Sequence, residues 1–220
     1  MTKPALQYYL SLARSSRIEL EEKKSRFIAL AKPVENVEEA QGFLREQQQK
    51  YPDATHHVYA WILAKPQMAQ SFSDDGEPQG TAGMPVLDVL AKQGLVQAAV
   101  IVVRYFGGIK LGAGGLVRAY SKAASLAVDQ AGIVRWLAHQ MYRLSSDYGL
   151  AEKLRYQLDQ LGYRQEEPIY QAKVEWEVAV ALGREEEFID LVKDLTADRV
   201  VYHKGEIREF PLQADLQPGT

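Results

Sequence analysis

The residues best suited to chemistry lie in one stretch, residues 98–125, which combines many glycines with cations. Five glycines occupy the nine positions from Gly107 to Gly115. Between Val89 and Val128 there are five lysines or arginines and no aspartate or glutamate, although the whole chain has net charge −3. Because free N–H groups at a helix start and nearby cations attract anions, this stretch predicts a site for phosphate or a nucleic-acid backbone.

The predicted anion-binding set joins the loop glycines to polar side chains of the flanking strand and helix. Its members are Arg104, Tyr105, Gly107, Gly108, Lys110, Gly112, Gly114, Gly115, Arg118 and Lys122. The glycines could instead serve only a tight strand-to-helix turn, with the cations on a solvated face. The loop fits neither G-x-x-x-x-G-K-[ST] nor G-x-G-x-x-G, which disfavours a P-loop NTPase and a Rossmann dehydrogenase. Nearby aromatic side chains could stack on bases, but we expect Phe106 to belong to the core.

A second loop, residues 71–83, gathers the carboxylates of Asp74, Asp75 and Glu77 among glycines and prolines. They could hold Mg²⁺ beside a phosphate, but we favour capping of turns and of the helix that follows. In an enzyme for a small phosphorylated or anionic substrate, these three residues and His57 would be the acid–base candidates. No nucleophile–base pair is recognisable, so an enzyme is the less favoured alternative. A combined site requires this loop and the glycine loop to meet in space.

We expect neither a metal nor a cofactor. His56 and His57 are adjacent in a predicted strand, so their side chains point to opposite faces and cannot easily share one ion. The chain contains no cysteine, which excludes disulfides and thiolate chemistry. Its longest apolar run, residues 58–64, is too short to span a membrane, and a cytoplasmic location is the default expectation.

Several elements must position these loops. The apolar, β-branched residues 98–103 predict a strand covered on both faces, and the helix after the glycine loop should begin near Leu116. Asn36, followed by Glu38 and Glu39, predicts a helix start. Residues 6–13 have apolar side chains at helical spacing, which predicts a short N-terminal helix or a frayed arm. Lys23-Lys24 separates two predicted strands, most simply as an exposed turn. A ligand role for that pair is the less favoured alternative.

Charge divides the chain into two parts. Residues 1–136 hold 16 lysines and arginines against 13 acids, whereas residues 137–220 hold 10 against 16. This asymmetry favours two domains, the first better suited to an anionic partner. Beyond the boundary, the predicted order is strand 139–146, helix 148–161, strands 163–167 and 172–182, helix 184–197 and strand 199–210. That βαββαβ order is typical of a ferredoxin-like domain.

Four segments, in the same order, resemble the signature blocks of the YigZ/IMPACT family: residues 22–27, 53–57, 73–83 and 103–112. The resemblance implies an α+β fold, with residues 1–135 like ribosomal protein S5 domain 2 and residues 136–212 ferredoxin-like. We expect a disordered tail over residues 213–220. The resemblance also implies a link to translation. We therefore expect a regulatory protein that contacts RNA, the ribosome or a translation factor, with a possible protein partner for the acidic second domain.

Overall fold

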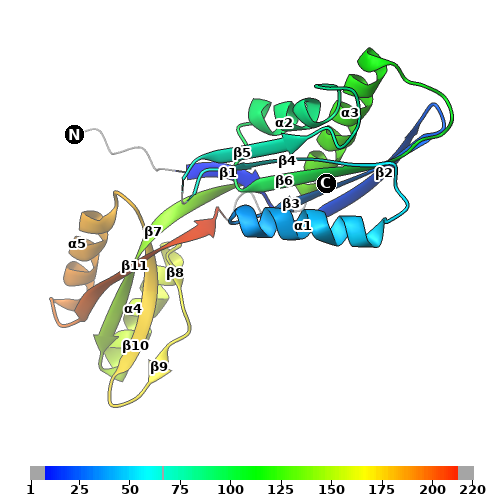
Figure 1. Cartoon of the computed structure of the whole chain (residues 1–220). Coiled ribbons are helices and arrows are strands. Elements are labelled where there is room, and N and C mark those ends of the chain that lie inside the picture. Colours follow the sequence, from blue (N-terminus) through cyan, green and yellow to red (C-terminus); the bar gives the residue numbers. More distant parts are fainter. Residues whose placement is uncertain (1–7, 66, 213–220) are drawn as a thin grey trace. The chain divides into compact units, whose positions relative to one another are not determined.

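The computed structural model describes residues 8–65 and 67–212 (Figure 1). The predicted tail, residues 213–220, lies outside this range. Contacts divide the described chain into two compact units, residues 9–135 and residues 136–212, the latter together with residue 8. No helix in the described ranges is long and apolar enough to cross a membrane.

The first unit is built on a five-stranded antiparallel sheet in the order β2–β3–β6–β4–β5. Its strands are β2 (Ser16–Glu22), β3 (Ser25–Pro33), β4 (His56–Leu63), β5 (Ala69–Ser73) and β6 (Ala98–Tyr105). Three helices accompany it: α1 (Val37–Lys50), α2 (Gly83–Lys92) and α3 (Ala113–Ala131). Strand β6 is the central strand, and the glycine loop leads directly from it to α3 (Figure 1).

Both faces of β6 are buried, which confirms the prediction for residues 98–103. Val100 and Val102 join the core between the sheet and helices α2 and α3. Ile101 and Val103 face the other way and join a second core beneath α1. Since side chains alternate along a strand, an apolar run with no polar interruption requires such a two-sided cover.

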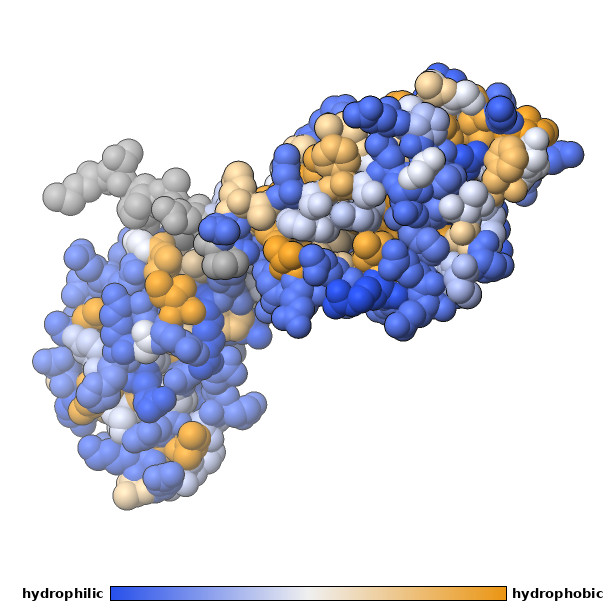
Figure 2. All heavy atoms as spheres, viewed as in Figure 1, coloured by the Kyte–Doolittle hydropathy of each residue, from blue (hydrophilic) through white to orange (hydrophobic). Residues whose placement is uncertain are grey.

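Helix α1 begins where its sequence predicts. The Asn36 side chain accepts a hydrogen bond from the Glu39 N–H at 2.9 Å, and Glu38 and Glu39 occupy the first turn. Phe43 packs into the core, whereas the outward side of the helix carries mostly hydrophilic side chains (Figure 2). The helix therefore closes one face of the sheet.

One predicted element and two predicted boundaries were wrong. Residues 8–12 form strand β1 (Tyr8–Leu12) instead of a helix, because the Val96 N–H donates to the Leu10 carbonyl and this tertiary pairing overrides the local spacing. Helix α3 begins at Ala113 instead of Leu116, because Gly112 ends the loop with φ +74°. Strand β7 begins at Ile133, ahead of the predicted start at residue 139.

The second unit confirms the ferredoxin-like prediction. Its elements are β7 (Ile133–Ser146), α4 (Tyr148–Gln160), β8 (Arg164–Gln165), β9 (Ile169–Tyr170), β10 (Val174–Ala181), α5 (Glu185–Thr196) and β11 (Val201–Pro211). β7 pairs antiparallel with both β10 and β11, and the short β8 and β9 pair with β10. Trp176 and Phe188 are buried in the core beneath α4 and α5. We find no predicted site residue in this unit.

Candidate anion-binding site

The two loops singled out in the sequence meet at one cavity of about 420 Å³. The carboxylate loop contributes Glu77 and Pro78, and the glycine loop contributes residues 110–113. The remaining lining residues are Thr55, His56, Arg104, Phe106 and Leu116. We call this space the loop cavity.

A buried ion pair forms one wall of the loop cavity. The Arg104 guanidinium donates to Glu77 Oε1 through Nη1 at 2.5 Å and to the Ser25 hydroxyl through Nη2 at 3.1 Å. Both charged side chains are only 4% exposed. The Tyr120 hydroxyl donates to the same Glu77 oxygen at 2.7 Å. Burial raises the pKa of Tyr120, and its hydrogen bond to the Glu77 carboxylate raises it further, so the hydroxyl stays protonated and remains a donor.

Two aromatic rings enclose the Arg104 guanidinium. Its Cζ lies 5.3 Å from the centroid of Phe27 and 5.6 Å from that of Phe106. Phe27 belongs to the core, but Phe106 is 47% exposed, so the expectation that Phe106 is a core residue was wrong. The ring covers the cation at the cavity instead of filling apolar space. Tyr120, by contrast, is fully buried and cannot stack on an external base.

Asp74 is a cap, as favoured in the sequence. Its carboxylate accepts hydrogen bonds from the N–H groups of Gly80, Ala82 and Gly83, at 2.8, 2.9 and 2.8 Å. Partial burial alone would raise the pKa of this carboxyl, but the three backbone donors outweigh burial and leave the pKa below its ordinary value. The carboxylate thus neutralises the N-terminus of α2 and holds the loop closed.

Asp75 and the two histidines organise the turn beside the cavity. Asp75 Oδ2 accepts from the His57 N–H at 2.5 Å, and the Asp75 carbonyl accepts from His56 Nδ1 at 2.7 Å. Because a carbonyl can only accept, Nδ1 of His56 carries the proton, and its Nε2 lies 3.7 Å from Glu77 Oε1. His57 Nε2 contacts the Tyr51 carbonyl at 3.0 Å. Within the described ranges, no three His, Asp or Glu side chains gather to hold a metal ion.

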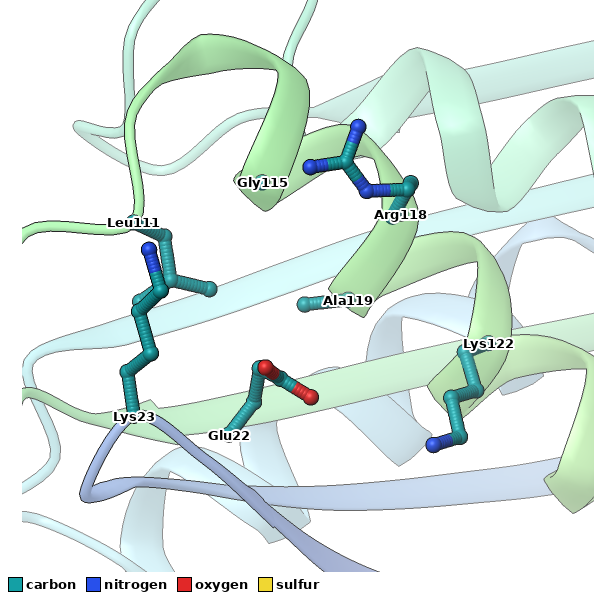
Figure 3. A pocket seen from close by; sticks show the side chains of 7 residues that line it. All are labelled: Glu22, Lys23, Leu111, Gly115, Arg118, Ala119 and Lys122. Atoms are coloured by element: carbon teal, nitrogen blue, oxygen red, sulfur yellow. The ribbon is translucent and has the colours of Figure 1, made fainter.

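Cations gather in a second, smaller pocket of about 230 Å³ on the other side of Leu111. Figure 3 shows Arg118 and Lys122 projecting from one face of α3, opposite Lys23 and Glu22 from the β2–β3 turn. Gly115 and Ala119 line its floor. Arg118, Lys122 and Lys23 form no ion pair within the part of the chain that the structure describes. We call these three side chains the cationic cluster.

The turn that presents Lys23 is strained. Lys23 and Lys24 have φ of 48° and 63°, so both lie in the left-handed region, as in a type I′ hairpin turn. Asparagine and glycine are the usual residues there, because a side chain on Cβ is disfavoured at positive φ. The pair does form the expected exposed turn, but Lys23 also lines the pocket. The sequence signal for a pocket role of Lys23 is that two lysines stand between the strands, at turn positions where asparagine or glycine is usual.

Close backbone approach explains one glycine of the loop. A Cβ at Gly107 would overlap the carbonyl group of Lys24, and the Gly107 N–H donates to the Ser25 hydroxyl at 3.3 Å. Gly108 and Gly112 have φ of 84° and 74° instead, which favours glycine at both positions. The glycine loop is therefore fastened to the β2–β3 turn, which carries Lys23.

The N-terminus of α3 carries no cap. Gly112 has no side chain to cap with, and the first turn contains no acidic residue. The first helical hydrogen bond runs from the Leu116 N–H to the Gly112 carbonyl, so the N–H groups of Ala113, Gly114 and Gly115 have no acceptor within the helix. Their partial positive charge lies between the two pockets, beside Lys110 and Arg118.

Tyr105, a further member of the predicted set, lines neither pocket. Its hydroxyl donates to Asp53 at 3.0 Å, and Arg26 lies 5.6 Å over its ring. The structure therefore divides the predicted set. Arg104, Lys110 and Gly112 line the loop cavity, and Gly115, Arg118 and Lys122 line the second pocket. Tyr105, Gly107, Gly108 and Gly114 line neither.

Comparisons with known proteins agree along most of the chain. A family model described as the Impact N-terminal domain matches residues 23–128, and one described as Domain of unknown function (DUF1949) matches residues 144–199. The chain is 35% identical over 202 residues to IMPACT family member YvyE of Bacillus subtilis, covering 92% of this chain and 93% of that protein. It is 38% identical over 176 residues to IMPACT family member YigZ of Escherichia coli, covering 79% of this chain and 86% of that protein. A crystal structure described as that of a hypothetical protein matches with TM-score 0.60 and 34% identity, covering 91% of this chain and 98% of that chain.

Proposed function

This chain belongs to the IMPACT family, and from that premise we propose that it is a translation-associated protein that binds RNA through the cationic cluster. The link to translation comes from the family resemblance. The choice of RNA comes from the site. Phosphate groups spaced along a strand are the natural ligands of several separate cations on one surface.

One observation carries the proposal: Lys23, Arg118 and Lys122 line one pocket and form no ion pair among the described residues. Paired cations would gain little from a phosphate, because they would first have to leave their carboxylates. Gly115, in the uncapped first turn of α3, lines the same pocket. The strained Lys23-Lys24 turn fits a backbone shaped for a ligand, since strain of this kind concentrates at functional sites.

The carboxylate loop gives the enzyme alternative little support. Asp74 caps α2, Asp75 holds the His57 N–H, and Glu77 is paired with Arg104. Each carboxylate has a structural partner, so none is free to exchange protons with a substrate without first breaking that contact.

The test is binding of the full chain to total RNA and to purified ribosomes, with the salt concentration varied. We expect log affinity to fall linearly with log salt, and Arg118→Ala/Lys122→Ala to lower the slope by about 1 to 2 and to weaken binding at low salt. The matched control is Arg45→Ala/Lys50→Ala, which removes the same charge from exposed positions of α1 on the opposite face of the sheet.

A further variant tests the role of the acid in the pocket. Glu22 is half-buried beside the three cations, and Glu22→Gln should tighten RNA binding because a phosphate no longer meets a carboxylate. No RNA or ribosome binding at low salt would refute the proposal. So would equal losses in the α3 and α1 double variants, because binding would then follow net charge alone.

A further inference from the structure

The loop cavity is separate from the cationic cluster, and we propose that it binds a single nucleoside monophosphate. The phosphate lies at Lys110 and the α3 N-terminus, and the base lies against Phe106. This inference does not require RNA to bind at the cationic cluster. A free nucleotide and the terminal residue of an RNA chain present the same chemistry, so either is a ligand under this proposal.

The part of the cavity proposed for the phosphate contains hydrogen-bond donors that have no acceptor in the described protein. Lys110 is exposed and lines the cavity together with Gly112 and Ala113, where the N–H groups of α3 begin. No side chain of the described chain caps these groups. A phosphate is the usual anion at such a helix start, and a lysine beside it adds charge.

Arg104 provides a second, independent indication of a ligand. It lines the loop cavity, its side chain is 4% exposed, and its Nε has no hydrogen-bond partner in the described ranges. Its other two nitrogens are held by Glu77 and Ser25. A buried cationic donor without an acceptor is uncommon in proteins, and a ligand in the cavity can supply the missing acceptor.

The base end is apolar and open. Phe106 is 47% exposed, and its ring lines the cavity beside Pro78 and Leu116. An exposed ring on a rigid support is the usual platform for stacking a base. Thr55 and His56 also line the cavity. The Thr55 hydroxyl accepts from the Phe106 N–H at 3.0 Å, and its own proton can still be donated to the polar edge of a base or to the ribose.

Size and charge restrict the ligand to one nucleotide. A volume of about 420 Å³ lies in the lower part of the range for small-molecule pockets, and Leu111 separates it from the neighbouring pocket. Glu77 is the one carboxylate in the lining, and it is shared by Arg104 and Tyr120. Its charge is therefore balanced within the protein and does not oppose an entering phosphate.

The test is calorimetric titration of the full chain with AMP, GMP, CMP and UMP, with adenosine and inorganic phosphate as partial ligands. We expect at least one monophosphate to bind at least about tenfold more tightly than either partial ligand. Lys110→Ala and Phe106→Ala should each weaken it about tenfold, whereas Phe106→Tyr should retain it. Arg45→Ala/Lys50→Ala is the control that should leave binding unchanged, and the thermal midpoint of every variant establishes that it folds.

An RNA oligomer with a 5′-phosphate, compared with the same oligomer ending in a 5′-hydroxyl, separates the two sources. A preference for the phosphorylated end that is lost in Lys110→Ala identifies an RNA terminus, and its absence identifies a free nucleotide. The proposal is refuted if no monophosphate binds at millimolar concentration, if phosphate alone binds as tightly, or if Lys110→Ala and Phe106→Ala bind normally. Because the RNA test rests on Arg118 and Lys122, either proposal can fail alone.

Discussion

Neutralising Glu77 tests how the loop cavity is held together. In Glu77→Gln the Arg104 cation stays buried, at 4% exposure, with Ser25 as its remaining strong partner and only neutral acceptors nearby. Removing one partner of a buried ion pair typically costs about 3–5 kcal/mol. The glutamine oxygen can still accept one hydrogen bond from Arg104 or Tyr120, so we expect a loss in the free energy of unfolding at the lower end of that range, about 3 kcal/mol. At about 2–4 °C per kcal/mol for a chain of this size, the thermal midpoint should fall by roughly 6–12 °C.

The assay is urea and thermal unfolding of the full chain, followed by circular dichroism and by tryptophan fluorescence, since Trp61 is buried in the first unit. The same substitution at a partly exposed site, Glu177→Gln beside Arg143 and Arg208, is the control and should cost less than about 1 kcal/mol. A Glu77→Gln/Arg104→Met variant should recover part of the loss, because it removes the unpaired charge. If Glu77→Gln costs no more than Glu177→Gln, the ion pair is not what stabilises this wall.

Three further outcomes follow from the contacts around the loops. Gly107→Ala should lower the free energy of unfolding by at least about 2 kcal/mol, because the added Cβ would overlap the Lys24 backbone. Urea unfolding measures this loss. A smaller loss would show that the loop can move to accept the Cβ at little cost in free energy. Lys24→Gly should raise the free energy of unfolding by roughly 0.5–1 kcal/mol, because glycine adopts φ 63° without the strain that a side chain causes there. An unchanged urea midpoint would contradict strain at the turn. The pKa of the Asp74 carboxyl is lowered in the folded state. The carboxylate therefore stabilises the fold at pH values above its ordinary pKa of 3.8, and this stabilisation is lost as the pH falls through the lower folded pKa. Asp74→Asn should therefore lose less stability than the wild type between about pH 6 and about pH 3, and parallel pH profiles would refute the capping role.

The elements were predictable where one physical signal dominates. The uninterrupted apolar run of β6, the Asn36 cap of α1 and the alternation in β10 each required the structure that is observed. Strand β1 was not predictable from spacing, because Leu10 pairs with residues more than eighty positions away. Local pattern carries no information about such a partner.

The site was predictable in its residue types and less so in their partners. The sequence brings Glu77 and Arg104 into the candidate list for different reasons, as an acid and as an anion-binding residue, whereas the structure pairs them in the interior. Phe106 was misplaced because hydrophobicity predicts burial, and its contact with the Arg104 cation is a tertiary feature. Lys23 enters the pocket through the geometry of a turn, which the two lysines suggest only in retrospect.

The position of β6 has a consequence for synthesis on the ribosome. β3 ends at Pro33, yet one of its edges remains unpaired until β6, which ends at Tyr105, has been made. At roughly 5–20 residues per second, those intervening seventy or so residues take about 4–14 s to translate. During that time the nascent β2–β3 hairpin carries apolar side chains on both faces of β3, among them Phe27 and Ile28, and an open strand edge. The emerging chain must therefore be shielded from aggregation until its central strand arrives.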